Sequence, residues 1–265
     1  MTDDADDAVL EGSRAHYEDA EYYDQAYRKR RDDVRFYAQL AAQHGGPVLE
    51  LGCGTGRVTK GIVERDVAVV GVDAVDAMLE RARARLAKPK RLAKRVEWVE
   101  GDLRSIRLER RFPLVIAPFN VLNHLYFRAD FERAMATVHA HLAEGGRFAF
   151  DVRMPHASEL ARDPEKVYRV GTVTRPDTKT RYHYRERFEL DPVTQIQRID
   201  FAFVGVDDPS DFHLTPLTHR VFTPTELEAL LHYNGFAIEH RYGDWSYEPL
   251  HAGAESQVMI CVQRE

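Results

Sequence analysis

The residues with the clearest chemical purpose lie in one short stretch, where Gly52, Gly54 and Gly56 follow an apolar run that ends at Leu51. A strand, a glycine turn and a helical pattern from Val58 make the layout of a nucleotide-binding βα unit. Glycine lacks a Cβ atom, so it allows a tight turn and lets the backbone lie against a ligand. The helix that follows begins with unpaired N–H groups. We therefore expect a ligand at this turn.

An acidic residue follows at the distance where nucleotide-binding folds hold a ribose. The run VAVVGV at 67–72 reads as a buried parallel strand that ends at Asp73, 19 residues after Gly54. A carboxylate at the carboxyl end of a strand can accept hydrogen bonds from both ribose hydroxyls. Asp73 could instead cap the helix that begins near Val75. With the glycine turn beside it, we expect Asp73 to bind ribose.

The spacing of the glycines distinguishes between ligands. A dinucleotide turn, G-x-G-x-x-G, would place its third glycine at position 57, but Arg57 stands there and the third glycine comes early, at Gly56. Glu50 precedes the first glycine by two residues. The resulting pattern, E-x-G-x-G-x-G, resembles motif I of the class I S-adenosylmethionine (SAM) methyltransferases. This resemblance implies a turn that lies along the amino-acid and ribose portions of SAM.

Further segments resemble the small-molecule branch of that family, which includes glycine N-methyltransferase and the aminosugar N,N-dimethyltransferases. They are APFNVLNHL at 117–125, GGRFAFDV at 145–152 and THRVFTPTELEALLHYNGF at 218–236. The resemblance implies that Asp102 receives the adenine amino group, although Asp102 could also cap a short helix. The residues implied to bind SAM are Tyr22, Tyr23, Glu50, Gly52, Cys53, Gly54, Gly56, Arg57, Asp73, Ala74, Met78, Gly101, Asp102, Leu103, Pro118 and Phe119.

Candidates for the methyl acceptor's site follow from the expected sheet, because ligands bind at the carboxyl edge of parallel strands. His124 and His219 are candidate bases and Tyr23 a third candidate catalytic group, while His124 could equally be a packing histidine. Arg153 could clamp an anionic group or form a surface salt bridge. The candidate substrate contacts are Asn120, Asn123, Arg153, His183 and Arg220.

Alternating strand and helix patterns predict an α/β fold: a Rossmann-like, mostly parallel seven-stranded sheet with helices on both faces. An antiparallel β-sheet is expected as an insertion between strands five and six, and the last two strands are expected to form an antiparallel pair. Strands are predicted at 48–51, 67–72, 96–99, 112–117, 147–152, 236–242 and 256–262. The predicted domains are an N-terminal tail with lid helices at 1–44, a SAM-binding core at 45–163 and 223–265, and the insertion at 164–222.

Two segments outside the core carry their own hypotheses. In the insertion, Tyr182, Tyr184 and Phe188 alternate with charged residues, so one face can pack while the sheet roofs the acceptor site. Four tyrosines cluster near the N-terminus, where aromatic faces could attract the sulfonium cation as a lid. Packing of this helix onto the core is the alternative. The tyrosines are Tyr17, Tyr22, Tyr23 and Tyr27.

Composition limits the classes of partner. The 265 residues carry a net charge of −6, which argues against nucleic acid and anionic membranes as partners. The basic run at 28–31 reads as a solvated helix face, with phosphate attraction as the alternative. The run at 81–95 reads as a charged helix end and loop, with a nucleic-acid or phosphorylated-substrate patch as the alternative. The acidic start of residues 1–12 reads as a disordered tail. Two cysteines and no Cys/His metal spacing predict neither disulfide nor metal. Without an apolar run of about 18 residues, we expect no membrane span and a cytoplasmic location.

The predicted function is a SAM-dependent methyltransferase that transfers a methyl group to an amine or hydroxyl of a small molecule by in-line displacement. After the fourth strand there is no Asn/Asp-Pro-Pro-Tyr and no Pro-Cys, which argues against enzymes that act on adenine, glutamine or cytosine C5. The alternatives are an RNA or protein methyltransferase, or a non-catalytic SAM-binding regulator; Arg57 argues against an NAD(P)-dependent oxidoreductase. Assembly as a homodimer is left open.

Overall fold

The computed structural model describes residues 9, 12 and 14–264, and it divides the chain into two compact units. One unit comprises the chain up to Arg28 together with Pro155–Val221, and the other comprises Lys29–Met154 with Phe222–Glu265. The acidic residues of the predicted tail, from Asp3 to Asp7, lie outside the described residues. The domain boundaries expected from the sequence stay a prediction.

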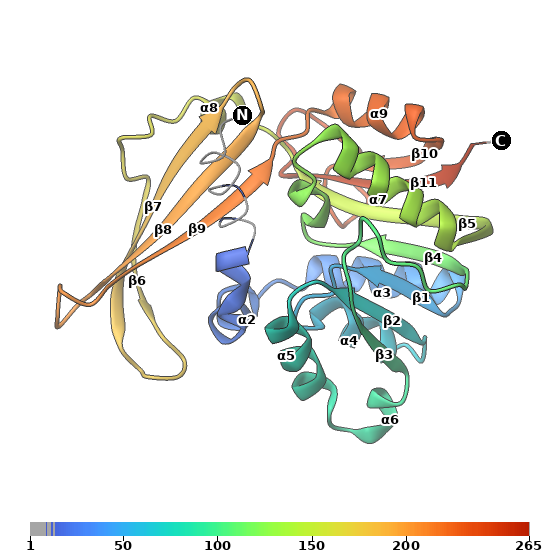
Figure 1. Cartoon of the computed structure of the whole chain (residues 1–265), viewed down its shortest axis with the longest axis horizontal. Coiled ribbons are helices and arrows are strands. Elements are labelled where there is room, and N and C mark those ends of the chain that lie inside the picture. Colours follow the sequence, from blue (N-terminus) through green and yellow to red (C-terminus); the bar gives the residue numbers. More distant parts are fainter. Residues whose placement is uncertain (1–8, 10–11, 13, 265) are drawn as a thin grey trace. The chain divides into compact units, whose positions relative to one another are not determined.

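The larger unit is built on a mixed seven-stranded sheet with the strand order β10-β11-β5-β4-β1-β2-β3 (Figure 1). Its strands are β1 (Val48–Leu51), β2 (Val69–Asp73), β3 (Val96–Glu100), β4 (Phe112–Ala117), β5 (Leu142–Arg153), β10 (Phe236–Tyr242) and β11 (Ser256–Gln263). The first five strands run parallel, and β11 pairs antiparallel with both β5 and β10. The predicted α/β fold and its antiparallel last pair are confirmed.

Helices cover both faces of this sheet because successive residues of a strand point to opposite sides. Leu49 and Leu51 of β1 join one apolar cluster with α7 and α9, whereas Val48 joins a second cluster with α3 and α4. The helices of this unit are α3 (Asp32–His44), α4 (Arg57–Val63), α5 (Asp76–Leu86), α6 (Lys90–Ala93), the 3-10 turn η1 (Val121–His124), α7 (Arg128–His141) and α9 (Pro224–Tyr233).

Local sequence signals explain where several elements begin. Thr223 caps α9 by accepting a hydrogen bond from the backbone N of Glu226 at 3.4 Å, and Pro224 occupies the first helical position. The fifth strand is longer than the predicted range 147–152, since β5 already begins at Leu142 and includes an irregular stretch at Gly145. A positive φ of 68° at Gly145 and a register shift opposite β4 accommodate that irregularity.

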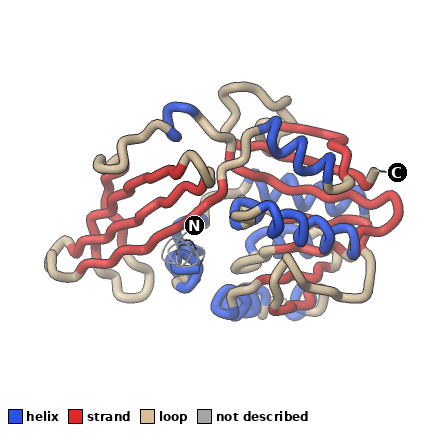
Figure 2. The backbone as a smooth tube through the Cα atoms, turned by 45° about the horizontal axis from the view of Figure 1, so that its top comes forward, coloured by secondary structure: helices blue, strands red, loops and turns tan. Residues whose placement is uncertain are grey.

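The smaller unit contains an antiparallel sheet with the order β6-β7-β8-β9, visible as four adjacent strands in Figure 2. Its elements are α2 (Ala20–Tyr27), α8 (Ala157–Leu160), β6 (Arg169–Thr174), β7 (Arg181–Asp191), β8 (Ile196–Gly205) and β9 (Phe212–Arg220). Burial alternates along β7 as predicted, with Tyr182, Tyr184 and Phe188 buried. Tyr17 packs against the apolar cluster that contains Tyr184 and Phe188, so the N-terminal aromatic segment covers this face of the sheet. In the described part of the chain, no helix has the length and apolarity that a membrane crossing requires.

Candidate functional site

The glycine turn after β1 has the backbone of a close ligand contact. Gly52, Gly54 and Gly56 have φ angles of 67°, 52° and 72°, in the left-handed region that favours glycine. A Cβ on Gly52 would clash with Val121, and one on Gly56 would meet the ring of Trp98 at 2.9 Å, so these two positions are needed for packing. A Cβ on Gly54 would meet nothing within 4 Å. The open side of the turn is therefore at Gly54.

Asp73 closes the turn from the end of the neighbouring strand. Its Oδ2 atom accepts a hydrogen bond from the backbone N of Gly54 at 2.7 Å, and its Oδ1 accepts one from Val75 N at 3.0 Å. Its main-chain oxygen accepts a bond from Gly101 N at 2.9 Å, which joins the ends of β2 and β3. Burial raises the pKa of Asp73, and the bonds from backbone N–H groups oppose that shift. One carboxylate thus links the glycine turn to the start of α5.

Glu50, which was also expected to bind the cofactor, lies beneath the turn. Its side chain is 1% exposed, and its Oε2 atom accepts a hydrogen bond from Thr59 Oγ1 at 2.6 Å. Burial raises the pKa of Glu50 to about 8. Its observed contact ties β1 to α4, and a direct cofactor contact stays a prediction. Cys53 and Met78 are likewise buried, whereas Ala74 is exposed.

The backbone is strained where β4 ends. Phe119 and Asn120 both have φ angles of 63°, and two consecutive residues other than glycine rarely adopt this conformation. Asp151 of β5 holds the turn, because its Oδ1 accepts from Phe119 N at 2.9 Å and its main-chain oxygen from Asn120 N at 3.2 Å. The Tyr37 hydroxyl donates to the same Oδ1 at 2.7 Å. Strain of this kind marks Phe119 and Asn120 as candidate ligand contacts.

Arg57, at the first position of α4, faces α3 rather than solvent. Its guanidinium forms a two-pronged ion pair with the fully buried Asp33, with N–O distances of 2.7 and 2.6 Å. The guanidinium carbon of Arg57 lies 5.2 Å from the centroid of the Phe119 ring. The guanidinium carbon of Arg30 lies 4.7 Å from the same centroid and 4.9 Å from that of the Trp245 ring. The expectation that residues 28–31 are simply solvated is wrong for Arg30, since these rings hold its guanidinium.

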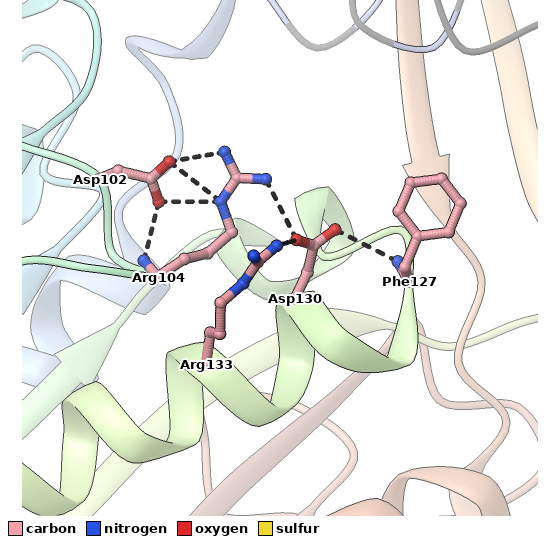
Figure 3. A network of polar contacts seen from close by, with 5 residues as sticks. All are labelled: Asp102, Arg104, Phe127, Asp130 and Arg133. Carbon is pink, nitrogen blue, oxygen red and sulfur yellow. Dashed lines mark hydrogen bonds and ion pairs between the residues drawn. The ribbon is translucent and has the colours of Figure 1, made fainter. Parts of the chain in front are cut away.

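Asp102, after β3, forms an ion pair (Figure 3). Arg104 donates to both of its carboxylate oxygens, from Nε at 3.0 and 2.9 Å and from Nη2 at 2.5 Å, and the backbone N of Arg104 donates to Oδ1 at 2.8 Å. Arg104 also reaches Asp130 of α7, which in turn pairs with Arg133. The pairing lowers the pKa of Asp102 against the effect of burial. An adenine amino group at Asp102 would have to share this carboxylate with Arg104.

The structure brings one group of the predicted residues together and places a second group in the other unit. The first group follows the carboxyl ends of the parallel strands: the glycine turn, Asp73, Gly101 to Leu103, Pro118 to Asn120 and Asn123. His124 contributes a ring nitrogen 3.1 Å from the Tyr126 hydroxyl, and Arg153 ends β5 beside Ser256. The second group comprises Tyr22 and Tyr23 in α2, His183 in β7, and His219 and Arg220 in β9.

Comparison with known proteins identifies the family. A family model described as a methyltransferase domain matches residues 48–146, the segment with the glycine turn, Asp73, Asp102 and Phe119. The chain is a SAM-dependent methyltransferase. Within this methyltransferase the described residues fit the cofactor, since open space lies beside the half-buried Gly54 and a carboxylate lies at the same turn.

Individual relatives support the same family. The methyltransferase is 26% identical over 236 residues to dTDP-3-amino-3,4,6-trideoxy-alpha-D-glucopyranose N,N-dimethyltransferase from Streptomyces venezuelae, covering 86% of this chain and 90% of that protein. It is 26% identical to the CcbJ methyltransferase from Streptomyces caelestis, with a TM-score of 0.76 over 88% of this chain and 90% of that chain. A glycopeptide N-methyltransferase, MtfA, complexed with SAM shares the fold at 23% identity, with a TM-score of 0.60 over 88% and 93% of the two chains.

Several residues of the site were not predicted from the sequence. Arg57 pairs with Asp33, and Phe119 is bonded to Asp151, which in turn accepts a hydrogen bond from Tyr37. These partners lie far apart in the chain, and no sequence motif indicates that they meet. Arg104 is different, because an arginine two residues after the expected adenine-binding acid is visible in the sequence. That spacing could have suggested the ion pair with Asp102.

Proposed function

We propose that this methyltransferase transfers the methyl group of SAM, by in-line displacement, to an amine or hydroxyl of a small molecule. The observation that carries the proposal is the match to an aminosugar N,N-dimethyltransferase over 90% of that protein's length, because the match extends beyond the common cofactor-binding domain. An amine is the favoured acceptor atom, since that relative is named for N-methylation and a neutral amine needs less acid–base assistance than a hydroxyl. No nucleic acid is expected as substrate, given the net charge of −6.

Bound SAM supplies the electrophilic methyl group, and the protein's own contribution is to bind, orient and exclude water. The glycine turn and Asp73 would hold the amino-acid and ribose portions. The turn at Phe119 and Asn120, fixed by Asp151, would present its backbone and the Asn120 side chain to the ligand. His124 and His219 remain candidate bases, and Asn123, Arg153, His183 and Arg220 remain candidate acceptor contacts.

The experiment that tests this function is transfer of label from methyl-labelled SAM to a panel of small amines and alcohols, with products identified by mass spectrometry. We expect a product one or two methyl groups heavier than its amine acceptor, together with S-adenosylhomocysteine. Label found only in added RNA or protein would contradict the small-molecule proposal. Tight SAM binding with no label in any acceptor would favour a non-catalytic regulator.

A further inference from the structure

Among the described residues, every donor that reaches the carboxylate of Asp102 belongs to one residue, Arg104. The carboxylate accepts hydrogen bonds from Nε of Arg104 at 3.0 and 2.9 Å and from Nη2 at 2.5 Å, and its Oδ1 also accepts from the backbone N of Arg104 at 2.8 Å. A carboxylate offers about four acceptor positions. The three donor groups of Arg104 therefore leave about one position, which is enough for one N–H group of a ligand.

Arg104 is itself fixed by a buried acid. Its Nη1 atom lies 3.3 Å from Oδ1 of Asp130, in the first turn of α7, and the Asp130 side chain is only 4% exposed (Figure 3). Asp130 also pairs with Arg133 and accepts a hydrogen bond from the backbone N of Phe127 at 3.4 Å. Charge-assisted bonds of this kind hold an arginine in one geometry. Within this described network, Arg104 bonds to both acids, whereas Arg133 bonds to Asp130 alone.

The position of Asp102 in the sheet suits contact with the base of the cofactor. The strands β1, β2 and β3 are consecutive neighbours in the sheet. The backbone N of Gly101 donates to the main-chain oxygen of Asp73 at 2.9 Å, so the chain segments that follow β2 and β3 adjoin. Neighbouring strands lie about 4.8 Å apart. A ribose bound at Asp73 would therefore place its base over the end of β3, beside Asp102.

From this arrangement we propose that Arg104 is a positioning residue that makes Asp102 selective for a cofactor whose base carries an amino group. The inference rests on the proposed function and concerns how that function selects its cofactor. Asp102, oriented by Arg104, offers its remaining acceptor position to the 6-amino group of adenine. A 6-oxo base would bring a second acceptor against the same carboxylate and lose this hydrogen bond. Burial acts to raise the pKa of Asp102, but the hydrogen bonds from Arg104 outweigh burial and lower the pKa, so the carboxylate stays ionised and accepting.

Calorimetric titration of the full-length chain with two probes tests this inference. The probes are S-adenosylhomocysteine and S-inosylhomocysteine, which differ only in the base, because the second carries an oxygen where adenine carries its 6-amino group. We expect the wild type to bind the adenine form about 10-fold or more tightly than the inosine form, the ratio expected for one hydrogen bond to a charged group. This ratio of affinities is the quantity that the variants should change.

Three variants separate positioning from a general loss of structure. Arg104→Gln should weaken binding of the adenine form about 10-fold and change binding of the inosine form by less than about 3-fold, because only the adenine form uses the oriented carboxylate. Arg104→Lys keeps the charge but cannot bond to both acids through a planar fork, so it should lower the ratio as well. The matched control is Arg133→Gln, which removes an arginine from the same network, leaves the bonds to Asp102 in place and should keep the wild-type ratio.

The possible failures of this inference and of the proposed function give different results. Equal binding of the two probes by the wild type would overturn the role of Asp102. A wild-type ratio in both Arg104 variants, including one in which both probes bind more weakly by the same factor, would show that Arg104 has only a structural role. The same loss of the ratio in Arg133→Gln would also overturn the inference. Absence of S-adenosylhomocysteine binding by the wild type would reject the proposed function, and this inference with it.

Discussion

Tyr37→Phe should weaken the hold of Asp151 on the strained turn at Phe119, because it removes the hydrogen bond from the Tyr37 hydroxyl to Asp151. The Tyr37 side chain is fully buried, and its hydroxyl donates to Asp151, which is 1% exposed. Burial raises the pKa values of both groups, and Asp151 depends on two donors, the hydroxyl and the backbone N of Phe119. Removing one donor from a buried carboxyl costs about 1–3 kcal/mol. The same loss should loosen the backbone that holds Phe119 and Asn120 at positive φ.

Two measurements check this prediction. Urea denaturation should show the unfolding free energy lowered by about 1–3 kcal/mol, and the methyl-transfer rate at saturating SAM should fall about tenfold, the equivalent of one lost hydrogen bond. The matched control is Tyr242→Phe, whose hydroxyl makes no hydrogen bond with the described residues and whose loss should change stability by less than about 0.5 kcal/mol. If the two variants behaved alike in both assays, the role given to Asp151 would be refuted.

Three further predictions concern pH and the N-terminal segment. Glu50 has a pKa of about 8 in the folded state, so it stays protonated at pH values at which Glu50 of the unfolded chain is already ionised. The free energy of unfolding of the wild type should therefore fall by up to about 5 kcal/mol between pH 4.5 and 8. Denaturation at several pH values should show that Glu50→Gln removes this slope; parallel profiles would contradict it. Burial lowers the pKa of His16 to about 4 in the folded state. As the pH falls from 6.5, His16 therefore takes up a proton in the unfolded chain first, and the free energy of unfolding should decrease by up to about 3 kcal/mol by pH 4. His16→Gln should remove this loss of stability between pH 6.5 and 4, and an unchanged loss would mean that other groups cause it. If α2 is a lid, hydrogen exchange at Ala20–Tyr27 should slow on addition of SAM; slow exchange without SAM, unmoved by it, would favour packing.

The elements that the sequence predicted well are those specified by local signals. Phe112–Ala117 and Phe236–Tyr242 were predicted to the residue, because Pro118 marks the end of the first strand and Gly235 the start of the second. The glycine turn and Asp73 were predicted together, because their spacing along the chain reflects one βα unit and its neighbouring strand.

What the sequence did not predict depends on long-range contacts. Asp33 and Arg57 are 24 residues apart, and Tyr37 and Asp151 are 114 apart, so no local pattern can show that their side chains meet. Asp19 and Arg175 are 156 residues apart, and only the folded unit shows that they form an ion pair, with 2.6 Å between Asp19 Oδ2 and Arg175 Nη2. The lid and acceptor roles of Tyr22, Tyr23, His183 and Arg220 stay predictions.

Calorimetric titration with SAM tests the central claim most directly, comparing wild type with Asp73→Asn. This substitution keeps an oxygen for the Gly54 N–H but removes the charge offered to the ribose. Wild type should bind SAM and its demethylated product but not NAD, and Asp73→Asn should bind SAM about 10- to 150-fold more weakly, the range expected for hydrogen bonds to a charged group. Unchanged SAM affinity in the variant, or NAD binding by wild type, would contradict the placement of SAM at this turn.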